Sequence, residues 1–83
     1  MNNQTVIVTG AASGIGLACT NLLLDKGAQV TAFDIQEKRM RENLPKNHPN
    51  LLQVYGDVSN PDDCDDVINQ TKNKFNELNA LIH

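Results

Sequence analysis

Three closely spaced glycines near the N-terminus have the spacing of a phosphate-binding turn. Gly10, Gly14 and Gly16 follow an apolar run at residues 5–9 and precede a helical pattern. Glycine lets the main chain turn sharply, approach a pyrophosphate and pack a helix closely against its strand. The free amides and the positive dipole end at the helix start then face the phosphates. Any tight strand-to-helix turn can use glycine, but the strand–turn–helix context here favours a pyrophosphate loop.

A carboxylate at the end of a second β-branched run offers another binding group. Asp34 closes residues 29–34, which have the pattern of a strand. A carboxylate in this place can accept hydrogen bonds from ribose hydroxyls and would repel a 2′-phosphate. The alternative interpretation is that Asp34 caps the helix after the strand. With the glycine loop, Asp34 predicts a site for a dinucleotide, with NAD favoured over NADP.

Strand and helix patterns alternate along the chain. Residues 5–9 are apolar without polar alternation, as expected of a parallel strand buried on both faces. Further strands are predicted at residues 29–34, 51–57 and 78–82. Helices are predicted from Ile15 to the stop signal at Gly27, over residues 36–43, and after the N-cap at Asn60. The predicted buried faces are Ile15, Ala18, Cys19, Leu22 and Leu23 in the first helix, and Cys64, Val67, Ile68, Thr71 and Phe75 in the third.

This β-α-β-α-β-α-β order predicts an α/β fold with a parallel sheet. We expect a partial Rossmann-type doubly wound sheet of strand order 3-2-1-4, with the first two helices on one face and the third on the other. Cys19 and Cys64 would then lie on opposite faces, which excludes a disulfide between them. The fourth strand would have an unpaired edge, so we expect the chain alone to self-associate.

Composition narrows the class of protein. The 83 residues suit one small domain, with 40% apolar and 20% charged residues, as in soluble globular chains. A net charge of −3 argues against a nucleic-acid partner. We find no apolar run long enough for a membrane span and no secretory signal, and two cysteines suit a reduced compartment. We therefore expect a cytoplasmic protein without a membrane partner. His48 has no second ligand nearby in the sequence, and residues 62–66 lack the glycine and spacing of a calcium loop, so we expect no metal site.

The glycine segment Thr-Gly-Ala-Ala-Ser-Gly-Ile-Gly resembles the short-chain dehydrogenase/reductase family, whose first turn reads Thr-Gly-x-x-x-Gly-x-Gly. The resemblance implies that Asp34 meets the adenosine ribose and that Asp57-Val58 meets the adenine. Residues 78–83 are similar to the strand before the family's Asn-Asn-Ala-Gly motif, although His83 stands where the first asparagine often lies. The cofactor-binding residues implied are Gly10, Ser13, Gly14, Ile15, Gly16, Asp34, Ile35, Asp57 and Val58.

The resemblance also bears on the choice of cofactor. NADP enzymes of the family usually place a basic residue just before the second glycine or just after the second strand. Those positions hold Ser13 and Ile35, which are uncharged. The basic residues further along, Lys38, Arg39 and Arg41, are interpreted as a solvated helix face. This supports NAD.

The family's hydride transfer uses a serine, an asparagine, and a tyrosine followed four residues later by a lysine. The one tyrosine here, Tyr55, has Ser59 at that distance and lies in a predicted strand, where we interpret it as a packed aromatic. No catalytic residue is therefore assigned. We expect residues 1–83 to be a single N-terminal Rossmann segment, truncated relative to the family and inactive alone.

The function implied by the resemblance is NAD binding within an oxidoreductase that interconverts an alcohol and a ketone, similar to 3-oxoacyl-acyl-carrier-protein reductases and related dehydrogenases. The expected partners are the dinucleotide, a small-molecule or acyl-carrier-linked substrate, and further copies in a homo-oligomer. One alternative is a non-catalytic nucleotide-binding or assembly module that is natively this short. Another is a related doubly wound domain with other chemistry, such as an epimerase or a nucleotide-linked methyltransferase.

Overall fold

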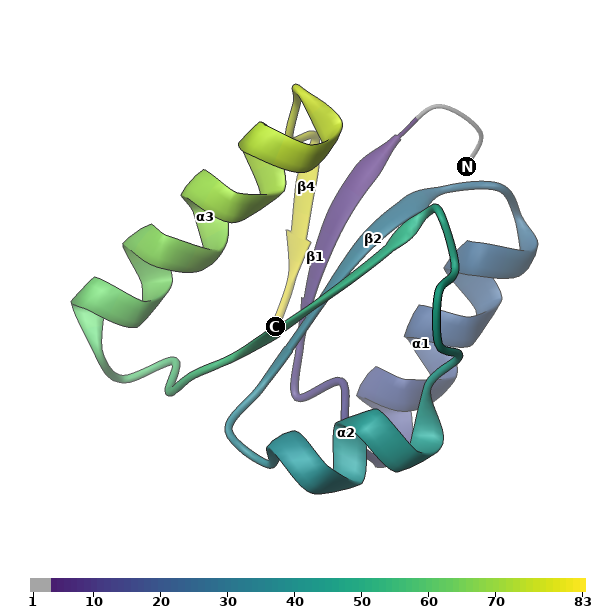
Figure 1. Cartoon of the computed structure of the whole chain (residues 1–83), viewed down its shortest axis with the longest axis horizontal. Coiled ribbons are helices and arrows are strands. Elements are labelled where there is room, and N and C mark those ends of the chain that lie inside the picture. The colour runs from purple at the N-terminus through teal and green to yellow at the C-terminus, as the bar shows by residue number, and fades with distance from the viewer. Residues whose placement is uncertain (1–3) are drawn as a thin grey trace.

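A parallel sheet of four strands forms the centre of the computed structural model, which describes residues 4–83 (Figure 1). The strands are β1 (Thr5–Thr9), β2 (Gln29–Asp34), β3 (Leu51–Tyr55) and β4 (Ala80–Ile82). The helices are α1 (Gly14–Asp25), α2 (Glu37–Asn43) and α3 (Pro61–Phe75). All pairings are parallel, and the sheet order is β3-β2-β1-β4. The predicted fold class and strand order are confirmed.

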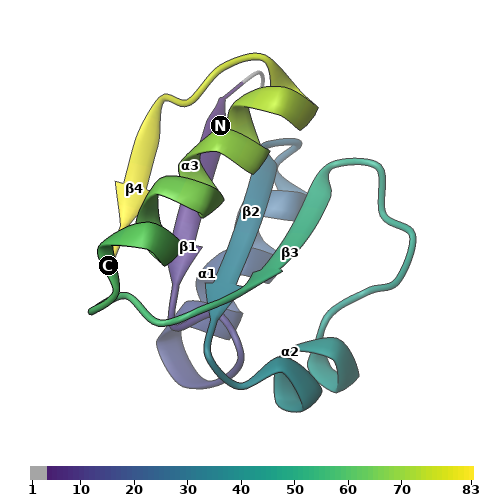
Figure 2. The same cartoon turned by 60° about the vertical axis from the view of Figure 1, so that its left-hand side comes forward.

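The three helices divide between the two faces of the sheet. α1 and α2 lie on one face, and α3 covers the other (Figures 1 and 2). Right-handed crossovers require this division, because the chain moves outward from β1 to β3 and then returns to the opposite side of β1. The carboxyl ends of β1, β2 and β3 therefore meet at one edge, beside the start of α1.

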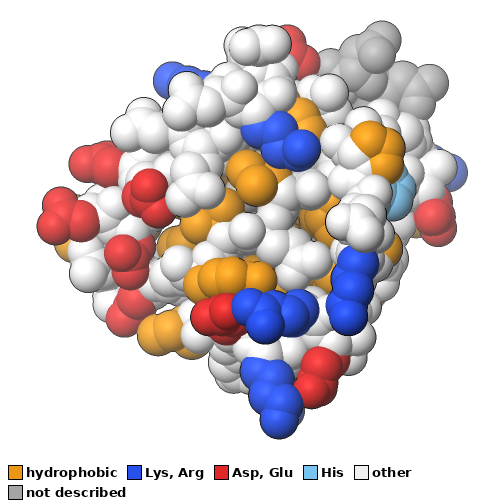
Figure 3. Space-filling model, in the orientation of Figure 1, with side chains coloured by type: hydrophobic (Ala, Val, Ile, Leu, Met, Phe, Trp, Pro, Cys, Tyr) orange, Lys and Arg blue, Asp and Glu red, His pale blue; other side chains and the backbone are white. Residues whose placement is uncertain are grey.

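The cap that the sequence predicts for α3 is present. The Asn60 side chain accepts a hydrogen bond from the Asp62 main-chain N–H at 2.9 Å. Asp62 and Asp63 lie in the first turn and Lys72 and Lys74 in the last, an arrangement that the helix dipole favours. Acidic side chains gather over the end of the molecule that α3 forms (Figure 3). Among the helices of residues 4–83, none is long and apolar enough to cross a membrane.

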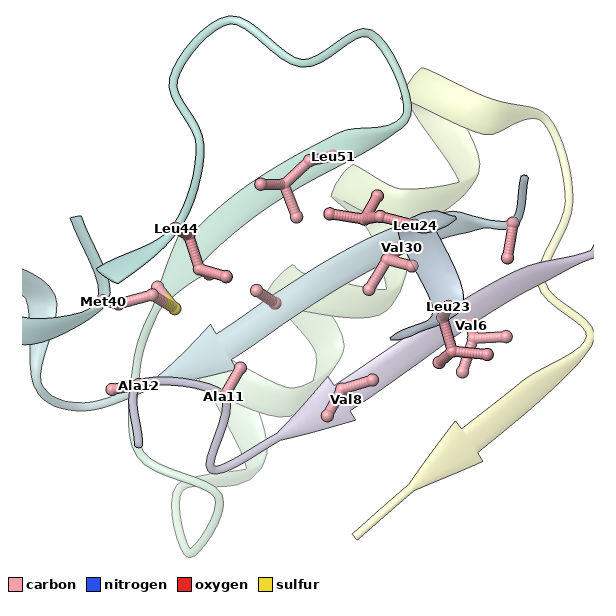
Figure 4. Close-up of a cluster of buried hydrophobic side chains, with 12 residues drawn as sticks. Val6, Val8, Ala11, Ala12, Leu23, Leu24, Val30, Met40, Leu44 and Leu51 are labelled. Atoms are coloured by element: carbon pink, nitrogen blue, oxygen red, sulfur yellow. The ribbon is translucent and has the colours of Figure 1, made fainter. Parts of the chain in front are cut away.

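Successive side chains of β1 point to opposite faces and contribute to two separate cores. Val6 and Val8 belong to the core under α1 and α2, where Met40 is fully buried (Figure 4). Ile7 packs with Phe33 and other residues under α3. This double burial explains why the sequence of β1 has no polar alternation.

The two cysteines are free and lie on different sides of the sheet. Cys19 packs against the core that contains Val6 and Val8. Cys64 lines a cavity on the α3 side, together with Ile7. The prediction that the two cysteines lie on opposite faces is confirmed.

A buried pair of hydroxyls joins α3 to the sheet. The Oγ1 atoms of Thr71 and Thr31 lie 2.8 Å apart, and Thr71 also bonds to the Val67 carbonyl at 2.7 Å. Both threonine residues are fully buried. Each hydroxyl therefore has a partner inside an otherwise apolar interface, as buried polar groups require.

The predicted buried face of α1 is correct only in part: Leu23 is buried and Cys19 packs against the core, but Ile15, Ala18 and Leu22 are exposed. Ile15 is 84% exposed and Leu22 is 56% exposed. Besides Leu23, α1 buries Thr20 and Leu24, which were not predicted. The helix is therefore rotated about its axis relative to the orientation that its apolar residues indicate.

Close contact between main-chain segments explains this rotation. Gly16 lies against the turn that follows β1, so close that a Cβ atom added to it would stand 2.1 Å from the Gly10 carbonyl oxygen. The Thr20 hydroxyl, one turn later, donates to the Gly16 carbonyl at 2.9 Å and is buried. The side of α1 that carries Gly16 must therefore face the sheet, whatever the other positions carry.

Two strand ends also differ from the prediction. β3 ends at Tyr55, so Asp57 and Val58 lie in the connection to α3. Tyr55 is 39% exposed and not packed inside, because β3 is an edge strand. The Arg41 guanidinium lies over its ring, 5.9 Å from the centroid. β4 begins only at Ala80, and all its residues are exposed. Self-association through this edge stays a prediction.

Candidate functional site

Five of the nine predicted cofactor-binding residues line one pocket. It has a volume of about 150 Å³ and lies where β1, β2 and β3 end. We call it the strand-end pocket; its lining residues are Gly10, Asp34, Ile35, Gly56, Asp57 and Val58. In doubly wound sheets, ligands bind at the carboxyl ends of the strands beside the point where the strand order reverses. The pocket stands at that position.

The other four predicted residues form the start of α1. Ser13 precedes the helix in an extended conformation, and its side chain makes no cap hydrogen bond. The first turn contains no acidic side chain. The first amides of a helix lack partners within the helix, and here no side chain of the turn supplies one. These amides and the helix dipole are thus available to a phosphate.

The glycines of the loop have two different roles. Gly10 and Gly14 have φ values of +66° and +59°, which L-residues with side chains rarely adopt. A Cβ atom on either would meet no atom within 4 Å, so open space lies above both. Gly16 differs, because its missing side chain permits contact with Gly10. The first two glycines leave room for a ligand, and the third brings α1 against β1.

Asp34 is held in place by two main-chain amides. Its Oδ2 accepts from the Ala12 N–H at 3.0 Å, and its Oδ1 accepts from the Gln36 N–H at 2.8 Å. The first bond ties the glycine loop to the end of β2. The second lies just before α2 and matches the capping interpretation. A carboxylate has about four acceptor positions, so Asp34 keeps acceptors for further donors.

Asp57, which also lines the strand-end pocket, forms a tight turn with Ser59. Hydrogen bonds from the Ser59 main-chain N–H at 2.9 Å and from its hydroxyl at 2.8 Å lower the pKa of the Asp57 carboxyl. The Asp57 N–H donates to Asp63 at 2.9 Å. Two exposed apolar side chains, Ile35 and Val58, also line the pocket.

Sequence reasoning missed Gly56, which the pocket requires. A Cβ atom there would lie 2.8 Å from the Phe33 ring and 3.1 Å from the Asp63 Cβ. The residue directly after β3 must therefore be small for α3 to approach the sheet. The sequence signal that could have identified Gly56 is the place of this glycine between an apolar strand and Asp57.

The charges at the strand-end pocket are of one sign. Asp34 and Asp57 line it, and no lysine or arginine does so among residues 4–83. Arg41 instead pairs with Glu37 and stacks on Tyr55. Within the same described range, no three His, Cys, Asp or Glu side chains come together in a way that could hold a metal ion.

Comparisons with known proteins agree on one family. A family model described as short chain dehydrogenase matches residues 4–83. Ipsdienol dehydrogenase of Ips pini is 35% identical over 83 residues, which is 100% of this chain and 31% of that protein. The chain thus spans about a third of the length of such relatives.

Solved structures show the same fold. An apo SCOR enzyme from Clostridium thermocellum superimposes with a TM-score of 0.87 at 34% identity, over 95% of this chain and 32% of that one. A short-chain dehydrogenase/reductase of unknown function from Caenorhabditis elegans, solved with cofactor, gives a TM-score of 0.88 at 30% identity, over 96% of this chain and 32% of that one.

Proposed function

Because this chain belongs to the short-chain dehydrogenase family, we propose that residues 1–83 form the NAD-binding segment of an oxidoreductase that interconverts an alcohol and a ketone. The observation that carries this proposal is the strand-end pocket. It gathers Gly10, Asp34 and Asp57 beside a helix start whose amides are free of side-chain caps.

The residues present fit a dinucleotide. Open space above Gly10 and Gly14 admits a diphosphate close to the main chain, and the amides at the start of α1 would donate to it. Asp34 would accept hydrogen bonds from the ribose hydroxyls. Ile35 and Val58 would pack on the faces of the adenine, with Asp57 at its edge. When bound, NAD supplies a nicotinamide that accepts or donates a hydride.

The charge of the pocket supports NAD over NADP. A 2′-phosphate beside Asp34 would place two anions together, and no basic side chain among residues 4–83 lines the pocket to compensate. Ser13 and Ile35 are uncharged. The discrimination in this proposal arises from repulsion of the wrong cofactor as well as from attraction of the right one.

We further propose that the groups that move protons to the substrate lie outside residues 1–83. Tyr55 stacks with Arg41 and does not line the strand-end pocket. The substrate in this proposal is a small-molecule or acyl-carrier-linked alcohol or ketone, as for 3-oxoacyl-acyl-carrier-protein reductases and related dehydrogenases. The whole protein in this proposal is a cytoplasmic homo-oligomer.

Calorimetric titration of the protein with NAD and with NADP tests the cofactor assignment. We expect NAD to bind more tightly. The substitution Asp34→Asn should weaken NAD binding about 10-fold or more, since hydrogen bonds to a charged group contribute about 1.5–3 kcal/mol. Asp65→Asn is the matched control, because it removes the same charge from an exposed position on α3 outside the pocket.

Equal or tighter binding of NADP by the unaltered protein would overturn the NAD assignment. Binding of neither nucleotide would overturn the proposed function as a whole. Because Asp34 also bonds to Ala12 and Gln36, the stability of each variant is measured by urea unfolding beside its affinity.

A further inference from the structure

A second concave surface lies along the free edge of β3. It is a groove of about 780 Å³ between α2, the loop that leads into β3, β3 itself and the last turn of α3. We call it the β3-edge groove; the lining residues that matter here are Arg41, Lys46, His48, Gln53, Tyr55 and Lys74. It shares no lining residue with the strand-end pocket. Lysine and arginine side chains surround apolar ones on this face of the molecule (Figure 3).

The β3-edge groove is basic in an acidic chain. It holds three of the seven Lys and Arg residues and none of the ten Asp and Glu residues, although the net charge is −3. Arg41 is paired with Glu37, whereas no ion pair engages Lys46 or Lys74 within residues 4–83. The exposed lysines come from separate elements, the loop before β3 and the end of α3. They flank β3 from both sides of the sheet.

The main chain of β3 is open along this groove. Within residues 4–83, β3 pairs only with β2, in a register that joins Val30 to Leu51 and Asp34 to Tyr55. The Val30 N–H donates to the Asn50 carbonyl at 2.7 Å, and the Gly56 N–H donates to the Asp34 carbonyl at 3.1 Å. Even-numbered residues of this segment therefore bond to β2. By the alternation of parallel pairing, the N–H groups of Gln53 and Tyr55 point outward.

The groove also contains an acceptor without a donor. The Gln53 Nε2 donates to the Pro45 carbonyl at 3.3 Å, while the Gln53 Oε1 is buried and has no hydrogen-bond partner in the described chain. Buried acceptors normally have a partner; because this atom is closed to solvent, a ligand supplies an N–H group to it only by displacing the Gln53 side chain. An inorganic anion offers charge alone. A peptide offers both N–H groups and carboxylates.

We infer that the β3-edge groove binds an acidic peptide segment, which adds to β3 as a further strand. The main chain of the bound peptide forms hydrogen bonds with the outward-pointing main-chain groups of Gln53 and Tyr55, as in other cases of strand addition. Because side chains of a strand alternate between faces, its carboxylates on one face meet Lys46 and those on the other meet Lys74. Overall negative charge disfavours nucleic acid as the occupant. This inference goes beyond the proposed nucleotide function and does not depend on it.

Fluorescence polarisation with the intact protein tests this. The probe is a fluorescein-labelled peptide of six residues, valine except for two adjacent glutamates at its centre, which place one carboxylate on each face of the strand. Its counterpart has lysine in place of glutamate. We expect the acidic peptide to bind and the basic one not to bind. The double substitution Lys46→Glu and Lys74→Glu should weaken binding about 10-fold or more, because it reverses two facing charges. The matched control, Lys38→Glu and Lys72→Glu, changes the same charge on α2 and α3 outside the groove and should change affinity less than about 2-fold.

Strand addition is separated from simple charge attraction by a second probe. The acidic peptide with alternate amides methylated keeps its charge but loses main-chain donors, and we expect its binding to be lost. Equal binding of the methylated peptide, equal effects of the two double substitutions, or tighter binding of a duplex DNA of matched charge would each overturn the inference. Circular dichroism confirms that each variant is folded, and NAD titration of each variant reports on the strand-end pocket separately.

Discussion

Alanine at Gly16 should destabilise the protein even though helix propensity predicts the reverse. Gly16 lies within the first turn of α1 and does not have a positive φ. On propensity alone, glycine to alanine inside a helix gains about 1 kcal/mol. Here the new Cβ atom would stand 2.1 Å from the Gly10 carbonyl oxygen and 2.6 Å from its carbonyl carbon. Both are main-chain atoms, so no side-chain rotation relieves the contact and α1 must move away from β1.

The magnitude follows from this geometry. Overpacking of a well-packed region costs about 1–3 kcal/mol in stability. A contact that is more than about 1 Å too short should cost an amount at the upper end of that range. Subtracting the propensity gain leaves a net loss of about 2 kcal/mol. For a domain of this size that loss lowers the Tm by about 8–16 °C. Urea unfolding followed by far-UV circular dichroism measures it directly.

Gly14→Ala should affect affinity as well as stability. Its φ of +59° imposes about 1–2 kcal/mol of strain on alanine, but the new methyl meets no protein atom and projects into the space proposed for the diphosphate. Gly27→Ala is the control, because Gly27 has φ of +85° at the other end of α1. NAD affinity should fall about 10-fold or more for Gly14→Ala and stay unchanged for Gly27→Ala. Unaltered or greater stability of Gly16→Ala would refute the close-contact reasoning, and equal affinities of the other two variants would refute the phosphate loop.

Three further substitutions test how α3 and its flanking turn are held. Thr71→Val leaves the Thr31 hydroxyl buried without its partner and should cost about 1–3 kcal/mol in urea unfolding, while adding Thr31→Val should restore most of that loss. Asn60→Ala removes the N-cap acceptor and should lower the unfolding free energy by about 1 kcal/mol, with unchanged m-value. Ser59→Ala removes the hydroxyl bond that helps to lower the pKa of Asp57, so that pKa should rise toward its ordinary value in an NMR titration. Because the pKa of Asp57 is lowered in the folded protein, this turn stabilises the protein at pH values above the ordinary aspartate pKa. That stabilisation is lost as the pH falls through the pKa of Asp57 in the folded state.

The strands of the sheet could be predicted from the sequence, because the pattern that identifies a strand lies within the strand itself. A strand buried on both faces is apolar at every position, and residues 5–9 show this directly. Once strands and helices alternate, the handedness of crossovers leaves few topologies. The placement of Asp34 and Asp57 at one pocket follows from the same rule, since the carboxyl ends of parallel strands share an edge. Single residues at the ends of strands are therefore predictable without knowing any side-chain contact.

The full buried face of α1 could not be predicted from such a local pattern. Amphipathic analysis assumes that apolar side chains decide which side is buried. In α1 the buried side is determined by Gly16, which has no side chain, and by Thr20, which amphipathic analysis counts as polar. Ile15 is left exposed beside the glycine loop for this reason. The same weakness affected Tyr55, because strand propensity does not show that β3 stands at an edge, although the predicted strand order contained that information.

The two interpretations of Asp34 turn out to be compatible. The sequence presented helix capping and ribose binding as alternatives, yet the carboxylate bonds to the Gln36 N–H before α2 and to the Ala12 N–H in the glycine loop. These two bonds fix its orientation before any ligand arrives, which reduces the entropy lost on binding. They also couple the loop to the end of β2, so a change at Asp34 must disturb both halves of the proposed site. A loss of NAD affinity in Asp34→Asn without a matching loss of stability would therefore assign the effect to the ribose contact itself.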